Sequence, residues 1–299
     1  MTALKTPTPA PQNPTRAPWR PAVALALAVV LGGCGALGTA PHAGPMRLST
    51  AAWPGALAAL LPADVLLLGE QHDAPDHQRL QQGAVQWLAA RGQLAAVVLE
   101  MAESGHGTQA LAPDATEAQV QAALHWNDAA WPWKAYGPVV MAAVAAGVPV
   151  LGGNLPRARM RATMGETAWD QHLPAPALQR QYEALREGHC GLLPESQMAP
   201  MARIQIARDA SLARSALQAL RPGQTVLLIA GGGHVLRDRG VPTHWPADLR
   251  SKVLLAQAGQ AQSAIKTEVD SVVQTPALPP QDHCAALRQR WQQGGRAGG

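Results

Sequence analysis

The chain has 299 residues, enough for one large α/β domain or two small ones. Its net charge of +4 comes without any run of Lys or Arg, which argues against a nucleic-acid-binding surface. The sequence contains no Phe, nine Trp and two Tyr, Tyr136 and Tyr182.

The N-terminal segment has the composition of a secretory signal peptide. Basic residues precede the apolar run 22–31, and no acidic residue occurs before Asp64. The apolar run is shorter than the roughly 20 residues that span a bilayer, so we expect a cleaved signal peptide over 1–33.

The motif Leu31-Gly-Gly-Cys34 resembles a bacterial lipobox. That resemblance implies cleavage before Cys34 and lipid attachment to its sulfur. Gly35, rather than Asp, follows the cysteine, which favours an outer-membrane lipoprotein facing the periplasm. Ordinary signal cleavage with an incidental cysteine is the alternative. Residues 34–50 are rich in Gly, Ala and Pro, and we interpret them as a flexible tether.

Short apolar runs then alternate with amphipathic segments. The apolar runs predict buried strands at 64–69, 95–99, 148–151, 225–230 and 252–256, and a shorter one at 271–274. The amphipathic segments predict helices at 54–61, 75–91, 114–124 and 138–146.

The stretch between the third and fourth strands is helical throughout. Patterns at 156–164, 175–187 and 195–219 predict a helical insertion over 156–220 that forms a smaller subdomain. The whole pattern predicts an α/β domain over 51–275, with a mostly parallel sheet covered by helices on both faces. A C-terminal tail follows at 276–299.

Two predicted helices have capping signals at their starts. Asp73 precedes Pro75, which suits an N-cap followed by a proline in the first turn. Asp114 stands three residues before Glu117, the spacing of a capping box.

Polar side chains stand where four predicted strands end. They are Glu70 with His72, Glu100, Asn154 with Arg157, and His234 after Gly231-Gly-Gly. The carboxyl ends of parallel strands share one edge of a sheet, so we expect these residues to lie near one another. We call Glu70, His72, Glu100 and His234 the rim. Alternatively, Glu100 is ordinary strand-end polarity, Asn154 and Arg157 cap a helix, or the rim is only a buried polar network.

The rim residues suit hydrolytic chemistry. Two His and two carboxylates could hold a divalent metal such as Zn²⁺ with an open position for water, or His72 could act as a general base. The sequence has no Gly-x-Ser-x-Gly elbow and no dinucleotide-binding fingerprint. One interpretation is therefore a metal-dependent or general-base hydrolase, a peptidase or esterase.

Several motifs together resemble the ChaN family. They are Gly69-Glu-Gln-His-Asp73, Trp133-x-x-Tyr136, Gly153-Asn-Leu-Pro-Arg157, His189-x-Gly191, Gln205-x-x-x-Asp209, and Gly231-Gly-Gly-His234 with Gly240-Val-Pro242. The resemblance covers roughly 50–275. Gly232 stands where many relatives carry Asn, which removes a hydrogen bond near His234.

The resemblance implies an iron-regulated, haem-binding lipoprotein that serves iron or haem acquisition. In this family a tyrosine ligates haem at a dimer interface, so a homodimer is expected, and the haem-uptake receptor that acts as partner is undefined. The superfamily also contains Tiki proteases and erythromycin esterase, which supports the hydrolase as the alternative.

A tyrosinate suits ferric haem iron, and we favour Tyr182 slightly over Tyr136. His189, Met198 and Met201 are secondary candidates, although methionines at this spacing are more often core residues. Arg157, with Arg159 and Arg161, could pair with haem propionates or form a solvated basic face.

We expect the haem region, which includes both tyrosines, to be separate from the rim, which could hold a divalent metal. Cys190 and Cys284 remain once Cys34 is lipidated. An oxidising compartment permits a disulfide between them.

Overall fold

The computed structural model describes residues 46–47, 52–259, 268–285 and 287–289. The predicted signal peptide and Cys34 lie outside these residues, as does the predicted tether except for Met46–Arg47. Within the described ranges, we find no helix that combines the length and the apolar character needed to cross a membrane.

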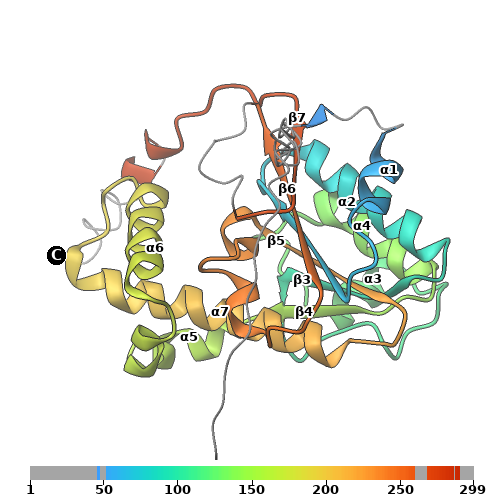
Figure 1. Cartoon of the computed structure of the whole chain (residues 1–299), viewed down its shortest axis with the longest axis horizontal. Helices are drawn as coiled ribbons and strands as arrows, with labels where there is room; N and C mark the ends of the chain where they lie inside the picture. Colours follow the sequence, from blue (N-terminus) through green and yellow to red (C-terminus); the bar gives the residue numbers. More distant parts are fainter. Residues whose placement is uncertain (1–45, 48–51, 260–267, 286, 290–299) are drawn as a thin grey trace, which may run out of the picture. The chain divides into compact units, whose positions relative to one another are not determined.

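The described residues form a seven-stranded sheet, all parallel, in the order β1-β7-β6-β2-β5-β3-β4 (Figure 1). Its strands are β1 (Met46–Arg47), β2 (Val65–Glu70), β3 (Leu94–Glu103), β4 (Val150–Asn154), β5 (Thr225–Gly231), β6 (Ser251–Ala258) and β7 (Ser271–Thr275). Every residue of β2 and β5 is buried, as expected for parallel strands covered on both faces. The predicted parallel α/β sheet is confirmed.

The labelled helices are α1 (Trp53–Ala58), α2 (Pro75–Ala89), α3 (Glu117–Ala123), α4 (Trp133–Ala145), α5 (Arg157–Thr163), α6 (Ala175–Gly188) and α7 (Met198–Gln218). Residues 283–285 and 287–289 of the tail are also helical. Short 3₁₀ helices are η1 (Thr167–Gln171), η2 (Glu195–Gln197), η3 (Gly232–Val235) and η4 (Val241–His244).

Helices cover both faces of the sheet because successive strand residues point to opposite sides. On one face Leu66 and Leu68 of β2 pack in a cluster with residues of α1 to α4. On the other face Val65 and Leu67 pack with Leu212 of α7. The alternation of these four residues shows that helices cover β2 on both faces, as predicted.

The predicted helical insertion is also confirmed. Between β4 and β5 the described chain contains helices and no strand. The C-terminal half of α7 covers the sheet, and its N-terminal half packs against α6, which lies with α5 at one end of α7 in Figure 1. One long helix thus belongs to both the α/β core and the insertion.

Both predicted helix caps are wrong in detail. Ala74 is the N-cap of α2 and gives no side-chain cap, while Asp73 lies 3.6 Å from His283 of the tail. The capping box of α3 is formed by Thr116 and Gln119. The predicted residues Asp114 and Glu117 are three apart in sequence, and so are the observed residues Thr116 and Gln119. Spacing alone therefore did not distinguish the two possible capping boxes.

Some observed element boundaries differ from the predicted ones, at places where proline or polar residues interrupt the hydrophobic pattern. Helix α4 begins at Trp133, five residues before the predicted start, and Pro138 lies inside it. Strand β3 continues to Glu103, and β4 runs from Val150 to Asn154.

Candidate functional site

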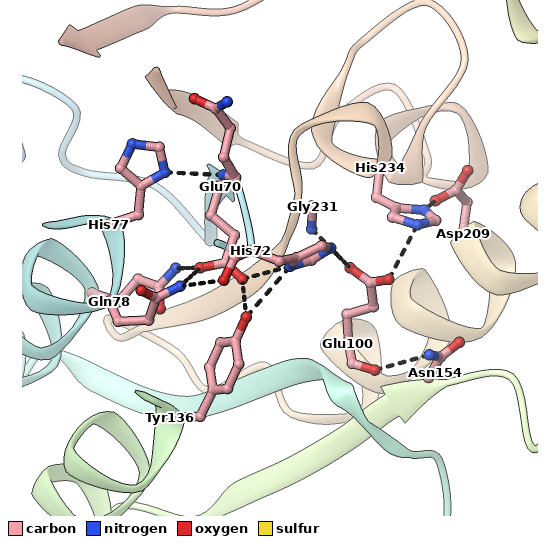
Figure 2. A network of polar contacts seen from close by, with 12 residues as sticks. Glu70, His72, His77, Gln78, Glu100, Tyr136, Asn154, Asp209, Gly231 and His234 are labelled. Carbon is pink, nitrogen blue, oxygen red and sulfur yellow. Dashed lines mark hydrogen bonds and ion pairs between the residues drawn. The ribbon is translucent and has the colours of Figure 1, made fainter. Parts of the chain in front are cut away.

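Glu70, the last residue of β2, is a buried carboxylate that accepts four side-chain hydrogen bonds (Figure 2). Oε1 accepts from His72 Nδ1 and from the Tyr136 hydroxyl, each at 2.7 Å. Oε2 accepts from Gln78 and Gln81 of α2. These donors occupy both oxygens and fix the orientation of the carboxylate.

His72 is the exposed end of the rim, with 39% of its side chain accessible. Its ring meets Trp131 edge-on at 4.8 Å, and it lines a cavity of about 490 Å³ with Pro75, Pro132 and Lys134. Burial alone would lower the pKa of His72, but the hydrogen bond from Nδ1 to Glu70 and the charge of Glu100 outweigh it and raise the pKa.

Glu100 lies where the pairing of β3 with β4 is irregular, between Leu99 and Glu103. Irregularities of this kind re-aim side chains beside functional sites. Its Oε2 accepts a 2.7 Å hydrogen bond from the backbone N–H of Gly231 and lies 3.8 Å from His72 Nε2. Its Oε1 lies 3.4 Å from His234 Nε2.

His234 lies between two buried carboxylates. Its Nδ1 is 2.6 Å from Asp209 Oδ1 on α7, and its Nε2 faces Glu100. Burial would lower the pKa of His234, but the two acids raise it well above the usual value. Burial raises the pKa of Asp209 to about 6, although the charge of His234 opposes the rise.

The site is therefore one continuous chain of acids and imidazoles. It runs in the order Asp209, His234, Glu100, His72, Glu70 and Tyr136 (Figure 2). The structure brings all four rim residues together, as the sequence predicted. Such a chain can hold and redistribute protons between a buried end and a partly exposed imidazole.

His72 occupies the space that a side chain at position 231 would need. A Cβ at this position would lie 2.8 Å from His72 Nε2 and 3.5 Å from Glu100 Oε2. The glycine thus lets the two neighbouring strand ends approach each other closely.

The expectation that Tyr136 belongs to a haem region separate from the rim is wrong. Its hydroxyl donates to Glu70, and the residue is 1% exposed. Burial and the negative charge of Glu70 raise its pKa far above the usual value, so the phenol stays neutral. Tyr136 is therefore a hydrogen-bond donor to Glu70 and part of the rim network.

The predicted divalent-metal site is not supported. The described residues contain no group of three or more His, Cys, Asp or Glu placed to hold a metal ion. Glu70 and His234 direct their polar atoms at neighbouring protein groups. The donor atoms that a cation would need are thus paired within the protein.

Asn154 and Arg157 take structural positions beside the rim. Asn154 donates a 2.9 Å hydrogen bond from Nδ2 to the Glu100 backbone carbonyl. The backbone N–H of Arg157 donates to Glu103 Oε1 at 3.0 Å, and Arg157 itself is exposed. Asn154 thus holds the β3 backbone that carries Glu100.

Tyr182 lies far from the rim in sequence, on α6 in the insertion. We define the Tyr182 cluster by its buried members Leu185, Met198 and Ala202, against which other half-buried residues pack: Leu178, Tyr182, Leu193 and Met201. Met198 is 2% exposed and acts as a core residue. The Nδ1 atom of His189 lies 2.8 Å from the carbonyl oxygen of Leu185.

A disulfide joins Cys190, just after α6, to Cys284 in the C-terminal tail. The Cα atoms are 5.6 Å apart, within the usual range for a disulfide. The tail is thereby tied to the insertion, and its ion pair between His283 and Asp73 ties it to the α/β core.

Three residues of the site were not predicted as site residues by the sequence analysis. Asp209 appeared only within a motif, and Gln78 and Gln81 did not appear. The available signal was a polar residue on the buried face of an amphipathic helix, since all three are at most 5% exposed. A buried acid on such a face requires a partner.

Comparison with known proteins gives one family and one fold. A family model described as haem-binding uptake, Tiki superfamily, ChaN matches residues 56–244. The solved structure described as cofacial heme binding to ChaN of Campylobacter jejuni is 23% identical, with a TM-score of 0.60, covering 73% of this chain and 89% of that one. The type III effector HopBA1 is 14% identical, with a TM-score of 0.41, covering 75% and 92%. No curated protein matches.

Proposed function

Because the chain belongs to the ChaN family of haem-binding uptake proteins in the Tiki superfamily, we propose that it binds haem and serves haem or iron acquisition. Anchoring through lipidated Cys34, an outer-membrane location facing the periplasm, a homodimer and a haem-uptake receptor as partner are parts of the same proposal. The lipobox-like motif supports the anchor.

The position of Tyr182 carries the proposal. Only two tyrosines occur in the chain, and Tyr136 is committed to Glu70. Tyr182 is half buried among Leu178, Leu193 and Met201, so a phenol stands within an apolar patch. Haem needs such a combination, because it offers a large apolar face and a ferric centre that favours an anionic oxygen.

Charges around the Tyr182 cluster also fit haem. Arg203 of α7 lies close enough to Tyr182 to favour an anionic oxygen there, although its guanidinium also donates to Asp170 at 2.7 Å. Arg186 lies on the last turn of α6. We propose that Tyr182 ligates the iron, that Met201 and Leu193 contact the macrocycle, and that arginines of the insertion pair with propionates.

Tyr182→Phe is expected to abolish tyrosinate ligation, since it removes the oxygen and keeps the ring. Hemin titration of the full chain, followed by absorption spectroscopy, should give a tyrosinate-type spectrum in the wild type. Tyr182→Phe should lose that spectrum and at least about tenfold in affinity. Tyr136→Phe is the matched control and should keep both. Loss of the spectrum in Tyr136→Phe alone would contradict the assignment.

A second candidate function, hydrolysis at the rim, is favoured by the position of His72. It ends the acid–imidazole chain and lines the 490 Å³ cavity. In this proposal His72 Nε2 takes a proton from water while Glu70 holds Nδ1. A peptide or ester with an apolar group beside the scissile bond suits a cavity walled by prolines.

The pH dependence distinguishes this activity from background hydrolysis. A general base works only when neutral, and the pKa of His72 is raised above 6.5. Turnover of ester and peptide panels should therefore rise with pH through a pKa above that value, and His72→Gln should abolish it. Turnover that persists in His72→Gln would exclude the rim as its source.

A further inference from the structure

Beyond the haem and rim sites, we propose that a third cavity binds a small oxyanion, either phosphate or a low-molecular-weight carboxylate. The cavity has a volume of about 280 Å³ and lies between α5, α7 and the loop after β4. Its polar lining comes from Arg159 and Thr163 of α5, Ser211 and Arg214 of α7, Ser104, and the carboxylate Glu166.

Two hydroxyl groups that line this cavity, on residues that are otherwise buried, have no hydrogen-bond partner among the described residues. Thr163 is 1% exposed and Ser211 is 4% exposed, and both line the cavity. Neither hydroxyl oxygen is fully enclosed by protein atoms, so each is open to the cavity and can bond to what fills it. The pair therefore presents two donors to whatever occupies the cavity.

The charge of the lining favours an anion. Glu166 is already engaged, since its Oε1 lies 3.6 Å from Arg159 and its Oε2 accepts from Trp169 Nε1 at 2.9 Å. Arg214 has no carboxylate within ion-pair distance in the described part of the chain. Two guanidinium groups and one carboxylate give a local charge of +1, and guanidinium groups bind oxyanions through charge-assisted hydrogen bonds.

The cavity is distinct from both sites described above. None of its lining residues belongs to the chain from Asp209 to Tyr136, and none belongs to the Tyr182 cluster. Its volume lies just below the roughly 300 Å³ at which drug-sized ligand pockets begin, so it fits a small ligand. Phosphate and a short dicarboxylate such as succinate share the required chemistry.

Isothermal titration of the full chain at constant ionic strength tests the proposal. Inorganic phosphate and succinate are titrated separately, with chloride as the reference salt. One of the two should bind saturably with a stoichiometry of one. Arg214→Gln should weaken that binding by about tenfold or more, and Thr163→Val by about fivefold, because valine keeps the shape and removes the donor.

Matched controls separate a specific site from general surface charge. Arg161 lies on α5, the helix that carries Thr163, but it is exposed and does not line the cavity. Arg161→Gln should therefore bind phosphate or succinate as the wild type does. Ser211→Ala gives a second hydroxyl variant if Thr163→Val folds poorly. No saturable binding up to about 10 mM, or equal binding by Arg214→Gln and Arg161→Gln, would overturn the proposal.

A titration of hemin-loaded protein distinguishes a free ligand from a haem propionate. Phosphate or succinate binding that persists in the loaded protein supports a separate site. Binding that disappears on loading would assign the cavity to haem itself and overturn the inference of an independent ligand.

Discussion

Replacing Glu100 by Gln is expected to lower the free energy of unfolding by about 3 kcal/mol near pH 6, the lower end of the range for breaking a buried ion pair. Glu100 is 3% exposed, and its oxygens lie 3.4 Å from His234 and 3.8 Å from His72. Gln has the same shape without the charge. The substitution therefore leaves the buried imidazolium of His234 with one neighbouring carboxylate fewer.

The size of this loss should depend on pH. The pKa of Glu100 is lowered well below 4.5, because the charge of and hydrogen bond from His234 outweigh burial. Its contribution to stability is therefore complete above 4.5 and is lost as pH falls through the folded pKa. His234 has a raised pKa, so its contribution is complete below 6.5 and is lost as pH rises through the folded value.

Both contributions are complete between about pH 4.5 and 6.5, where the variant should differ most from the wild type. Urea denaturation across that range measures the difference. Glu103→Gln is the control, because Glu103 lies on the same strand and its carboxylate accepts from the Arg157 backbone. A Glu100→Gln loss below about 1 kcal/mol would show that the pair does not stabilise the fold.

The arrangement of the rim could be predicted because it depends on topology. Uninterrupted apolar runs predict buried parallel strands, and parallel strands bring their carboxyl ends to one edge. Glu70 ends β2, Glu100 follows the regularly paired part of β3, and His234 follows β5. These three strands are neighbours in the sheet. His72 follows Glu70 by two residues. No side-chain detail was needed to group these four.

The partners of the rim could not be predicted, because they come from helices. Tyr136 and Asp209 reach it from α4 and α7, and their contacts depend on how each helix is rotated against the sheet. Periodicity identifies the buried face of a helix but not which residue of that face meets a given strand. The expectation that Tyr136 lies apart from the rim failed for this reason, although the sequence showed the motif Trp133-x-x-Tyr136 that contains it.

The C-terminal tail shows the same limit. The sequence permitted a bond between Cys190 and Cys284, but 94 residues separate them and no pattern places the tail beside α6. The structure brings the tail there after β7, past Asp73 and on to the C-terminal end of α6. The bond therefore closes a loop that includes all of α7, β5, β6 and β7.

Removing this disulfide is expected to lower the free energy of unfolding by about 3 kcal/mol, within the 2–5 kcal/mol typical of native disulfides. A closed loop of this length strongly restricts the unfolded chain, so the double variant Cys190→Ser with Cys284→Ser gains unfolded-state entropy. Chemical denaturation under oxidising conditions measures the loss. Adding a thiol reductant should lower the stability of the wild type to that of the variant.

In the folded protein, the effect of removing the disulfide should be confined to the tail and the end of α6. Without the bond, the described tail is held to the core by the partly exposed pair of His283 and Asp73, and exposed ion pairs contribute about 1 kcal/mol or less. Hydrogen exchange should therefore accelerate in the tail and at the C-terminal turn of α6, while β2 and β5 keep their protection. Cys34→Ser leaves the bonded pair intact and is the control. Equal denaturation midpoints for the oxidised wild type and the double variant would contradict a stabilising role for the bond.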